Sequence, residues 1–94
     1  MPEEKARATV LIDNERVRVT EWRFAPGAAT GYHRHGCDYV VVPMTTGKLL
    51  LKAPGGDHEA DLTQGVPCFR NVGVEHDVIN ANDYEFTFIE TELK

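Results

Sequence analysis

The sequence predicts an all-β domain, either a β-sandwich or a jelly roll. Short segments rich in apolar and β-branched residues recur at intervals of about ten residues, the usual spacing of strands in such domains. Glycine, proline, asparagine and aspartate separate these segments, as turns require. No stretch of helix length shows the apolar periodicity of an amphipathic helix. Many short strands without helices are typical of two packed antiparallel sheets.

The 94 residues are expected to form one domain, 1–94, because this length suffices for one hydrophobic core but not for two. Residues 1–7 are polar and contain Pro2, so we expect a disordered or loosely docked N-terminal arm. The expected strands cover residues 9–12, 16–24, 32–42, 48–52, 58–62, 67–70, 76–80 and 84–93.

One of these strands, 16–24, has an irregular pattern. Val17 and Val19 place apolar side chains on one face, whereas Trp22 and Phe24 place them on the other. A bulge or bend near Thr20 would bring both pairs toward the core. We therefore expect an irregularity in the middle of this strand.

Several expected strands are apolar on both faces, as where Val40 and Val42 alternate with Tyr39 and Val41. A strand that is buried on both sides needs a second covering layer, and an open sheet edge invites unwanted pairing. We therefore expect a homodimer, in which sheets of two copies pack together or exchange strands.

Charge and hydropathy exclude two classes of partner. The chain has 10 basic and 15 acidic residues, a net charge of -5 and no Lys/Arg cluster, so nucleic acid is not an expected partner. The longest apolar runs, such as 39–44, are too short to cross a bilayer, and the first residues are charged, which favours a cytoplasmic protein without membrane contact. Cys37 and Cys68 form no C-x-x-C pair, so we expect reduced thiols.

The strongest functional signal is a pair of histidines at the end of the segment 27–35. His33 and His35 are two residues apart, so on a strand their side chains project to the same face and can hold one metal ion. A third histidine, His76, follows a second glycine-containing turn. A lone strand histidine is more often a surface or core residue than a ligand, but this repeated arrangement makes His76 a candidate ligand.

The two segments have the spacings G-x5-H-x-H, in residues 27–35, and G-x5-N-x-G-x2-H-x3-N, in residues 65–80. They resemble the two signature motifs of the cupin superfamily, whose second motif has proline where this chain has Asn71. The resemblance implies a jelly-roll barrel, also described as a double-stranded β-helix, that binds one divalent metal ion. The chain is similar in particular to small bacterial cupins named for a role in β-alanine degradation. The metal ligands that the resemblance implies are His33, His35 and His76.

The chain departs from the first motif of the superfamily at one position. A glutamate usually follows the second histidine after a short spacer, and this chain has Tyr39 and Val40 there. Strand alternation directs Tyr39 to the face of His35 and Asp38 away from it, and which of the two replaces the glutamate stays open. Three neutral imidazoles leave the ion its full positive charge, which favours an anionic ligand. Iron, zinc, manganese and nickel all accept such ligands.

The remaining candidate site residues surround the expected metal. Tyr39 is a candidate proton donor or orienting group, and Arg70 near the expected mouth would hold a substrate carboxylate. Phe69 is either a substrate-binding wall or a core residue, and Cys37 is either a pocket thiol or a small buried hydrophobe. His58 follows a hairpin turn and is expected to be solvated.

Two other groups of residues are expected to be structural. Asn71 and Asn80 suit turns or the capping of backbone groups. The aromatic residues expected in the core are Trp22, Phe24, Phe69, Phe86 and Phe88.

Three functions are compatible with these residues. The first is a metal-dependent enzyme that acts on a small carboxylate-bearing metabolite by dioxygenase-like or Lewis-acid chemistry, because three protein ligands leave coordination positions open. The second is a non-catalytic module that binds or senses a small ligand and reports through its dimer partner. The third is a vestigial jelly roll that no longer holds metal. Open coordination favours the first, and the missing glutamate favours the third.

Overall fold

Alternating apolar residues and frequent turns produce nine strands and no helix in residues 4–94, the part of the chain that the computed structural model describes. The strands are β1 (Arg7–Asp13), β2 (Val17–Phe24), β3 (His33–Arg34), β4 (Asp38–Pro43), β5 (Gly47–Ala53), β6 (Gly56–Leu62), β7 (Cys68–Arg70), β8 (Glu75–Asn80) and β9 (Phe86–Leu93). The all-β expectation is therefore confirmed.

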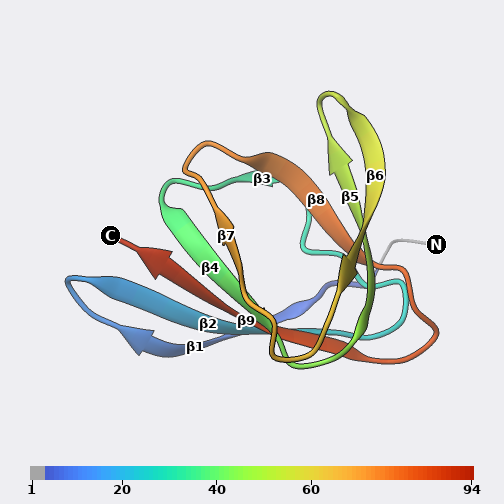
Figure 1. Ribbon diagram of the computed structural model, residues 1–94, viewed down its shortest axis with the longest axis horizontal. Coiled ribbons are helices and arrows are strands. Elements are labelled where there is room, and N and C mark those ends of the chain that lie inside the picture. Colours follow the sequence, from blue (N-terminus) through green and yellow to red (C-terminus); the bar gives the residue numbers. More distant parts are fainter. Residues whose placement is uncertain (1–3) are drawn as a thin grey trace.

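Two antiparallel sheets face each other across the interior (Figure 1). One has the order β1-β2-β9-β4-β7 and the other has the order β3-β8-β5-β6. Several neighbouring strands come from distant parts of the sequence, as where the last strand, β9, lies between β2 and β4. This arrangement is the jelly-roll barrel that the sequence predicts.

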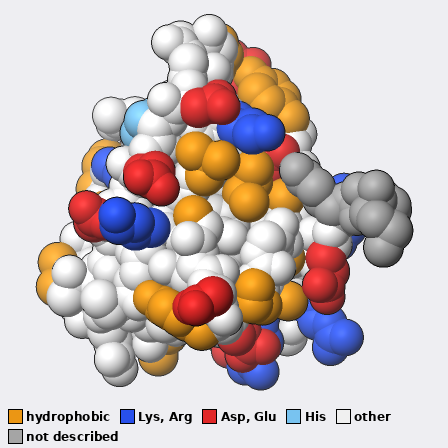
Figure 2. Space-filling view, turned by 90° about the vertical axis from the view of Figure 1, so that its right-hand side faces the viewer, with side chains coloured by type: hydrophobic (Ala, Val, Ile, Leu, Met, Phe, Trp, Pro, Cys, Tyr) orange, Lys and Arg blue, Asp and Glu red, His pale blue; other side chains and the backbone are white. Residues whose placement is uncertain are grey.

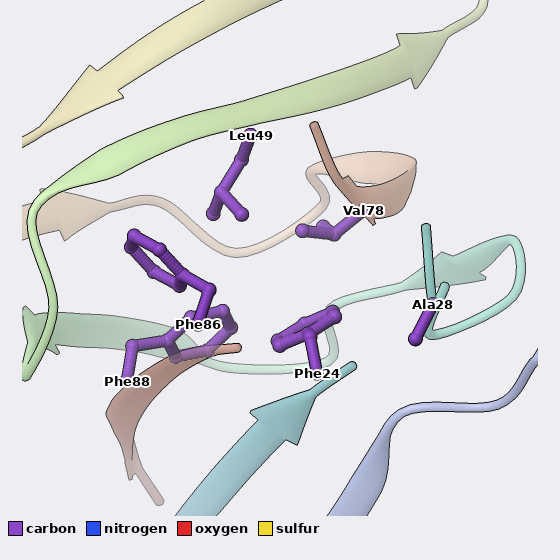
Figure 3. Close-up of a cluster of buried hydrophobic side chains, with 6 residues drawn as sticks. All are labelled: Phe24, Ala28, Leu49, Val78, Phe86 and Phe88. Atoms are coloured by element: carbon purple, nitrogen blue, oxygen red, sulfur yellow. The ribbon is translucent and has the colours of Figure 1, made fainter. Parts of the chain in front are cut away.

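The hydrophobic core lies between the two sheets (Figure 3). Phe24 of β2 and Phe86 and Phe88 of β9 point toward Leu49 of β5 and Val78 of β8, and all five are buried. The ring centroids of Phe24 and Phe88 are 5.4 Å apart, within the range of favourable aromatic pairs. Three aromatic rings therefore hold the two strands to the opposite sheet.

The expected N-terminal arm is docked where the structure describes it. The backbone N–H of Ala6 donates to the carbonyl of Ala29, and the N–H of Ala29 donates to the carbonyl of Glu4, each at 2.9 Å. Strand β1 then begins at Arg7, earlier than expected. The expectation of disorder for residues 1–3 lies outside the described residues.

The irregularity expected in β2 lies in its neighbour. The register between β2 and β9 runs without a shift from Val17 to Phe24, so β2 itself has no bulge against β9. The register between β1 and β2 shifts between Val10 and Ile12, opposite Thr20. Alternation along β2 therefore directs Thr20 and the two following aromatic positions inward, and the valines before it outward.

Asn80 connects two loops beneath the core, the one that follows β2 and the one between β8 and β9. Its side chain is 2% exposed, and its Nδ2 donates to the carbonyls of Phe24, Ala25 and Tyr84 at 3.2, 3.2 and 2.8 Å. Its Oδ1 accepts from the backbone N–H of Asn82 at 3.0 Å. The expected backbone-capping role of Asn80 therefore matches its contacts.

Replacing Asn80 with alanine should lower the free energy of unfolding by about 2–3 kcal/mol, because buried carbonyl groups lose their donor. Urea denaturation followed by far-UV circular dichroism measures this loss. Asn71 is exposed and provides the control, since Asn71→Ala should change stability by no more than about 0.5 kcal/mol. Equal losses in the two variants would contradict the assignment.

The face on the right-hand side of Figure 1 carries small apolar patches separated by acidic and basic side chains (Figure 2). Residues 4–94 contain no helix with the length and hydropathy needed to cross a membrane.

Candidate metal centre

Two of the three candidate ligands are held opposite each other by strand pairing. His33 of β3 and His76 of β8 are direct partners in the antiparallel register, so their side chains leave the sheet on the same face. Their ring centroids are 4.9 Å apart. The pairing of β3 with β8 thus joins the two sequence motifs.

The third candidate ligand, His35, lies in the loop between β3 and β4, because the expected long strand 32–42 is interrupted there. Two backbone hydrogen bonds fix this loop: the N–H of His35 donates to Val74 at 2.9 Å, and the N–H of Gly73 donates to His35 at 2.8 Å. Gly73 has a φ of 94°, a conformation that suits glycine. The second motif therefore positions a residue of the first.

The three imidazoles converge on one point. The Nε2 atom of His35 lies 3.0 Å from the Nε2 atoms of both His33 and His76, and one nitrogen from each of the three rings lies within 4.8 Å of the others. Two nitrogens that bind one ion at about 2.1 Å each are separated by no more than about 4.2 Å, so both short separations fit a shared ion.

Hydrogen bonding shows why neutral imidazoles alone do not satisfy this cluster. The Nδ1 of His33 lies 2.7 Å from the carbonyl oxygen of Gly31, which only accepts, so Nδ1 carries the proton and Nε2 presents a lone pair. The Nε2 of His35 either donates to that lone pair or accepts from His76, and it cannot do both. A cation among the three lone pairs satisfies all of them.

The electrostatic environment keeps two of the rings neutral. Burial, and then repulsion from His33 and His76, lowers the pKa of His35 to about 4. Burial, and then repulsion from His33 and Arg70, lowers the pKa of His76 to about 4 as well. Neutral imidazole is the form that binds metal, so these two ligands are ready for an ion at neutral pH.

The histidines line a cavity of about 50 Å³ between the sheets. Tyr39 is 2% exposed and lines the same cavity, where its ring stacks on His35 with a centroid distance of 3.9 Å. Burial, and then the Glu90 carboxylate, raises the pKa of Tyr39 to about 12, so its hydroxyl keeps its proton. Alternation within β4, where Val41 also lines the cavity, thus directs Tyr39 inward.

Strand β7 contributes Arg70 and Cys68 to the lining of the cavity. Arg70 pairs with Tyr39 in the register of β4 and β7, and no ion pair joins it to a carboxylate in the described chain. Phe69 alternates with these two residues and lies on the outer face, 54% exposed. The expectation of Phe69 as a cavity wall or core residue is therefore corrected.

Three further candidates lie outside the cavity. Asp38 points away from the histidines, and its Oδ1 accepts the backbone N–H of Val72 at 2.7 Å. Cys37 is partly buried in the loop before β4 and does not line the cavity. His58 is exposed on β6, as expected. Of the two residues considered for the place of the missing glutamate, only Tyr39 lies beside the imidazoles.

Sequence reasoning missed the carboxylate of this site. Glu90 of β9 is 7% exposed and lines the cavity, and its Oε1 lies 3.8 Å from the Nδ1 of His35. Trp22, expected simply in the core, also lines the cavity. Alternation in β9 provides the signal for Glu90, because it occupies the same face as Phe86 and Phe88.

The buried position of Glu90 predicts a pH-dependent stability. Burial, and then repulsion from Glu92, raises the pKa of Glu90 to about 7, although the Trp22 indole opposes the rise without completing a hydrogen bond. A raised folded-state pKa stabilises the fold below the unfolded-state value of 4.5, and this contribution is lost as the pH rises through about 7.

In metal-free protein, Glu90→Gln should therefore stabilise the fold more at pH 8 than at pH 4.5. The free energy of unfolding of the variant minus that of wild type should be roughly 2–3 kcal/mol larger at pH 8. Urea titrations at the two pH values, with a chelator present, measure the difference. Glu92→Gln removes a charge from the same strand and should show less than half of this change. An unchanged stability difference between the two pH values would contradict the raised pKa of Glu90.

Comparison with known proteins supports the fold and the relationship of the chain. No family model matches the sequence. The chain is 61% identical over 90 residues to the beta-alanine degradation protein BauB of Pseudomonas aeruginosa, covering 96% of this chain and 95% of that protein. It is also 61% identical to a cupin domain from Bordetella pertussis, whose crystal structure superposes with a TM-score of 0.98 and covers 100% of this chain and 98% of that one.

A more distant crystal structure shares the fold alone. A cupin superfamily protein from Desulfitobacterium hafniense is 16% identical and superposes with a TM-score of 0.74, covering 99% of this chain and 81% of that one. The jelly-roll barrel, the identity along nearly the whole chain and the converging histidines agree with one another. The chain therefore belongs to the cupin superfamily, within the family of small single-domain bacterial cupins that includes BauB.

Proposed function

We propose that this cupin is a metal-dependent enzyme that acts on a small carboxylate-bearing metabolite. The observation that carries the proposal is the convergence of the Nε2 atoms of His33, His35 and His76, which a shared cation satisfies better than any arrangement of neutral imidazoles. Iron, zinc, manganese and nickel all suit three imidazoles. When bound, such an ion supplies Lewis-acid or oxygen-activating chemistry.

The chain's own residues suit an anionic substrate. Arg70 lines the cavity and has no carboxylate partner in the described chain, so its guanidinium can hold a substrate carboxylate in bidentate fashion. The high pKa of Tyr39 keeps a proton on its hydroxyl at neutral pH, so the hydroxyl can donate a hydrogen bond that orients a bound substrate. The opposite sheet contributes an aliphatic lining to the cavity.

The name of the relative agrees with this class of substrate. The Pseudomonas protein is named for β-alanine degradation, and β-alanine is a small carboxylate. A cavity of about 50 Å³ also favours small ligands. β-Alanine and other three-carbon acids are therefore the first compounds to test.

The test combines elemental analysis with a search for turnover. Protein purified without added metal should contain close to one transition-metal ion per chain, and oxygen uptake or product formation should follow with small acids or thiols. Iron together with oxygen uptake would select dioxygenase-like chemistry, and zinc without uptake would select Lewis-acid chemistry. Bound metal without any turnover would instead select a binding or sensing module, and absence of metal would select a vestigial site.

The substrate class is tested at Arg70. Arg70→Gln should raise KM for a carboxylate substrate by about 10–100-fold, because it removes a charged bidentate contact. Arg34 is exposed outside the cavity, so Arg34→Gln is the matched control and should leave KM unchanged. An equal KM in the two variants would remove the carboxylate from the proposal.

We also propose a homodimer in which β1 packs against a second copy. All seven residues of β1 are exposed, and Val10, Leu11 and Ile12 are each at least 50% exposed on this edge strand. An uncovered aliphatic edge is a place for association. Strand β1 begins at Arg7 and ends at Asp13, so two antiparallel copies bring opposite charges together.

Sedimentation equilibrium tests the dimer. Wild type should sediment as a dimer, and Val10→Lys should shift it toward the monomer by at least about tenfold in Kd. Val66 is similarly exposed, at 57%, but lies outside β1, so Val66→Lys should remain dimeric. A monomeric wild type would refute the interface.

We further expect a cytoplasmic location, since both cysteines are free thiols.

A further inference from the structure

Glu90 is an unusual residue for the place it occupies. It lies in the middle of β9, paired with Thr20 on one side and Val41 on the other, and its side chain enters the interior between the sheets. Carboxyl groups are rarely this buried without a partner, because transfer from water into an apolar interior is costly. No lysine or arginine forms an ion pair with Glu90 in residues 4–94.

The groups near the carboxyl are hydrogen-bond donors that lack acceptors. The Trp22 Nε1 and the Tyr39 Oη are buried, and neither has a hydrogen-bond partner in the described chain. Both residues line the cavity with Glu90, and both interact with its carboxyl electrostatically. The third neighbour is the Nδ1 of His35, at 3.8 Å from Oε1. The Glu90 carboxyl therefore has three groups nearby that can donate a hydrogen bond, and none of them completes one to it.

The orientation of His35 makes its contact with Glu90 the informative one. The Nε2 of His35 faces the other two imidazoles, and its Nδ1 faces Glu90. A metal-bound histidine requires the proton on the nitrogen away from the ion, and a carboxylate at that nitrogen holds it there. In His33 the carbonyl of Gly31 has the same role, at 2.7 Å. At 3.8 Å the Glu90 carboxylate lies beyond hydrogen-bond distance, so it acts on the Nδ1 of His35 through its charge, whereas Gly31 acts on His33 through a direct hydrogen bond.

We propose that Glu90 is the positioning residue for His35. Its carboxylate lies behind this ligand and supplies the negative charge that a glutamate of the first cupin motif usually provides, at the position where this chain has Tyr39 and Val40. This inference rests on the proposed metal site. The carboxylate selects the tautomer of His35 that carries its proton on Nδ1 and directs the Nε2 lone pair toward the ion. It also offsets part of the charge of a divalent cation from within the barrel.

Two substitutions separate the acceptor from the charge. Glu90→Gln keeps an acceptor oxygen and removes the charge, whereas Glu90→Leu removes both at similar volume. Glu92→Gln is the matched control, because it removes a charge two residues along β9 from a side chain that does not line the cavity. Circular dichroism and thermal melting of each metal-free variant establish that it is folded before metal is added.

The first measurement is Co²⁺ affinity, followed by visible absorption at pH 7.5. Glu90→Gln should weaken Co²⁺ binding by about tenfold and Glu90→Leu by about a hundredfold. Losses of this size are typical when a residue that contacts a metal-ligating side chain is replaced. Glu92→Gln should change affinity by less than about threefold. Equal weakening in all three variants would indicate long-range electrostatics and overturn the inference.

The second measurement reports on His35 directly. In ¹⁵N-histidine spectra of metal-free protein, wild-type His35 should show the proton on Nδ1, and Glu90→Leu should shift it toward Nε2. A Glu90→Leu variant with wild-type tautomer and wild-type affinity would refute the role of Glu90. If wild type itself binds no Co²⁺, the metal site fails, whereas metal binding that ignores Glu90 overturns this inference alone.

Discussion

His35→Ala should reduce affinity for a divalent metal ion by roughly 10²–10³-fold, the largest effect expected from a single site substitution. Zinc-binding free energies of about 10–16 kcal/mol for four ligands correspond to roughly 2.5–4 kcal/mol for each ligand. His35 is the central ligand, since its Nε2 lies 3.0 Å from both other Nε2 atoms. Titration of metal-free protein with Co²⁺ or Zn²⁺ measures the loss.

His58 provides a control of the same residue type. It is exposed on β6 and does not line the cavity, so His58→Ala should retain wild-type affinity. His33→Ala, in a less buried ligand, should lose affinity to a similar degree while disturbing the fold less. Retention of affinity in both the His33 and His35 variants would show that the three imidazoles do not share an ion.

Phe86→Ala should lower the free energy of unfolding by about 3–5 kcal/mol, the largest effect expected on stability. Phe86 is fully buried and lies opposite Phe24 in the register of β2 and β9, where it packs in the core between the two sheets (Figure 3). Its removal leaves a cavity that neighbouring β-strands cannot close, because their hydrogen bonds fix their spacing. Urea denaturation of metal-free protein measures the difference.

Phe69 is the matched control for this substitution. The two residues have the same side chain, but Phe69 is 54% exposed on the outer face of β7. Phe69→Ala should therefore cost less than about 1 kcal/mol. If Phe69→Ala proved as costly as Phe86→Ala, the outer face would have to be covered in solution, as by a second copy of the chain.

Strand positions and turns were predictable because they depend on local preferences. The hairpin expected at 54–57 joins β5 to β6, with Ala53 paired to Gly56. Gly56 has a φ of 120°, a conformation that residues with a side chain rarely adopt. Alternation likewise predicted that Tyr39 would lie on the interior side, where it stacks on His35. Each of these features is determined by residues close together in the chain.

The errors arose where pairing between strands decided the outcome. The change of phase in β2 predicts a bulge or bend near Thr20, whereas the register shift lies in β1. Phe69 was expected inside, although alternation with Arg70 on the same short strand places it outside. Hydrophobicity alone does not identify the buried face of a short strand when its neighbours are unknown.

The sequence by itself determined the fold class, the strand-and-turn order and the three candidate ligands, because periodicity and motif spacing are local properties. Only the tertiary structure decided that β3 pairs with β8, which sets His33 opposite His76, and that β9 brings Glu90 behind His35. Those contacts join residues far apart in the sequence. They depend on which strands become neighbours when the two sheets close around the core, and no local pattern specifies that choice.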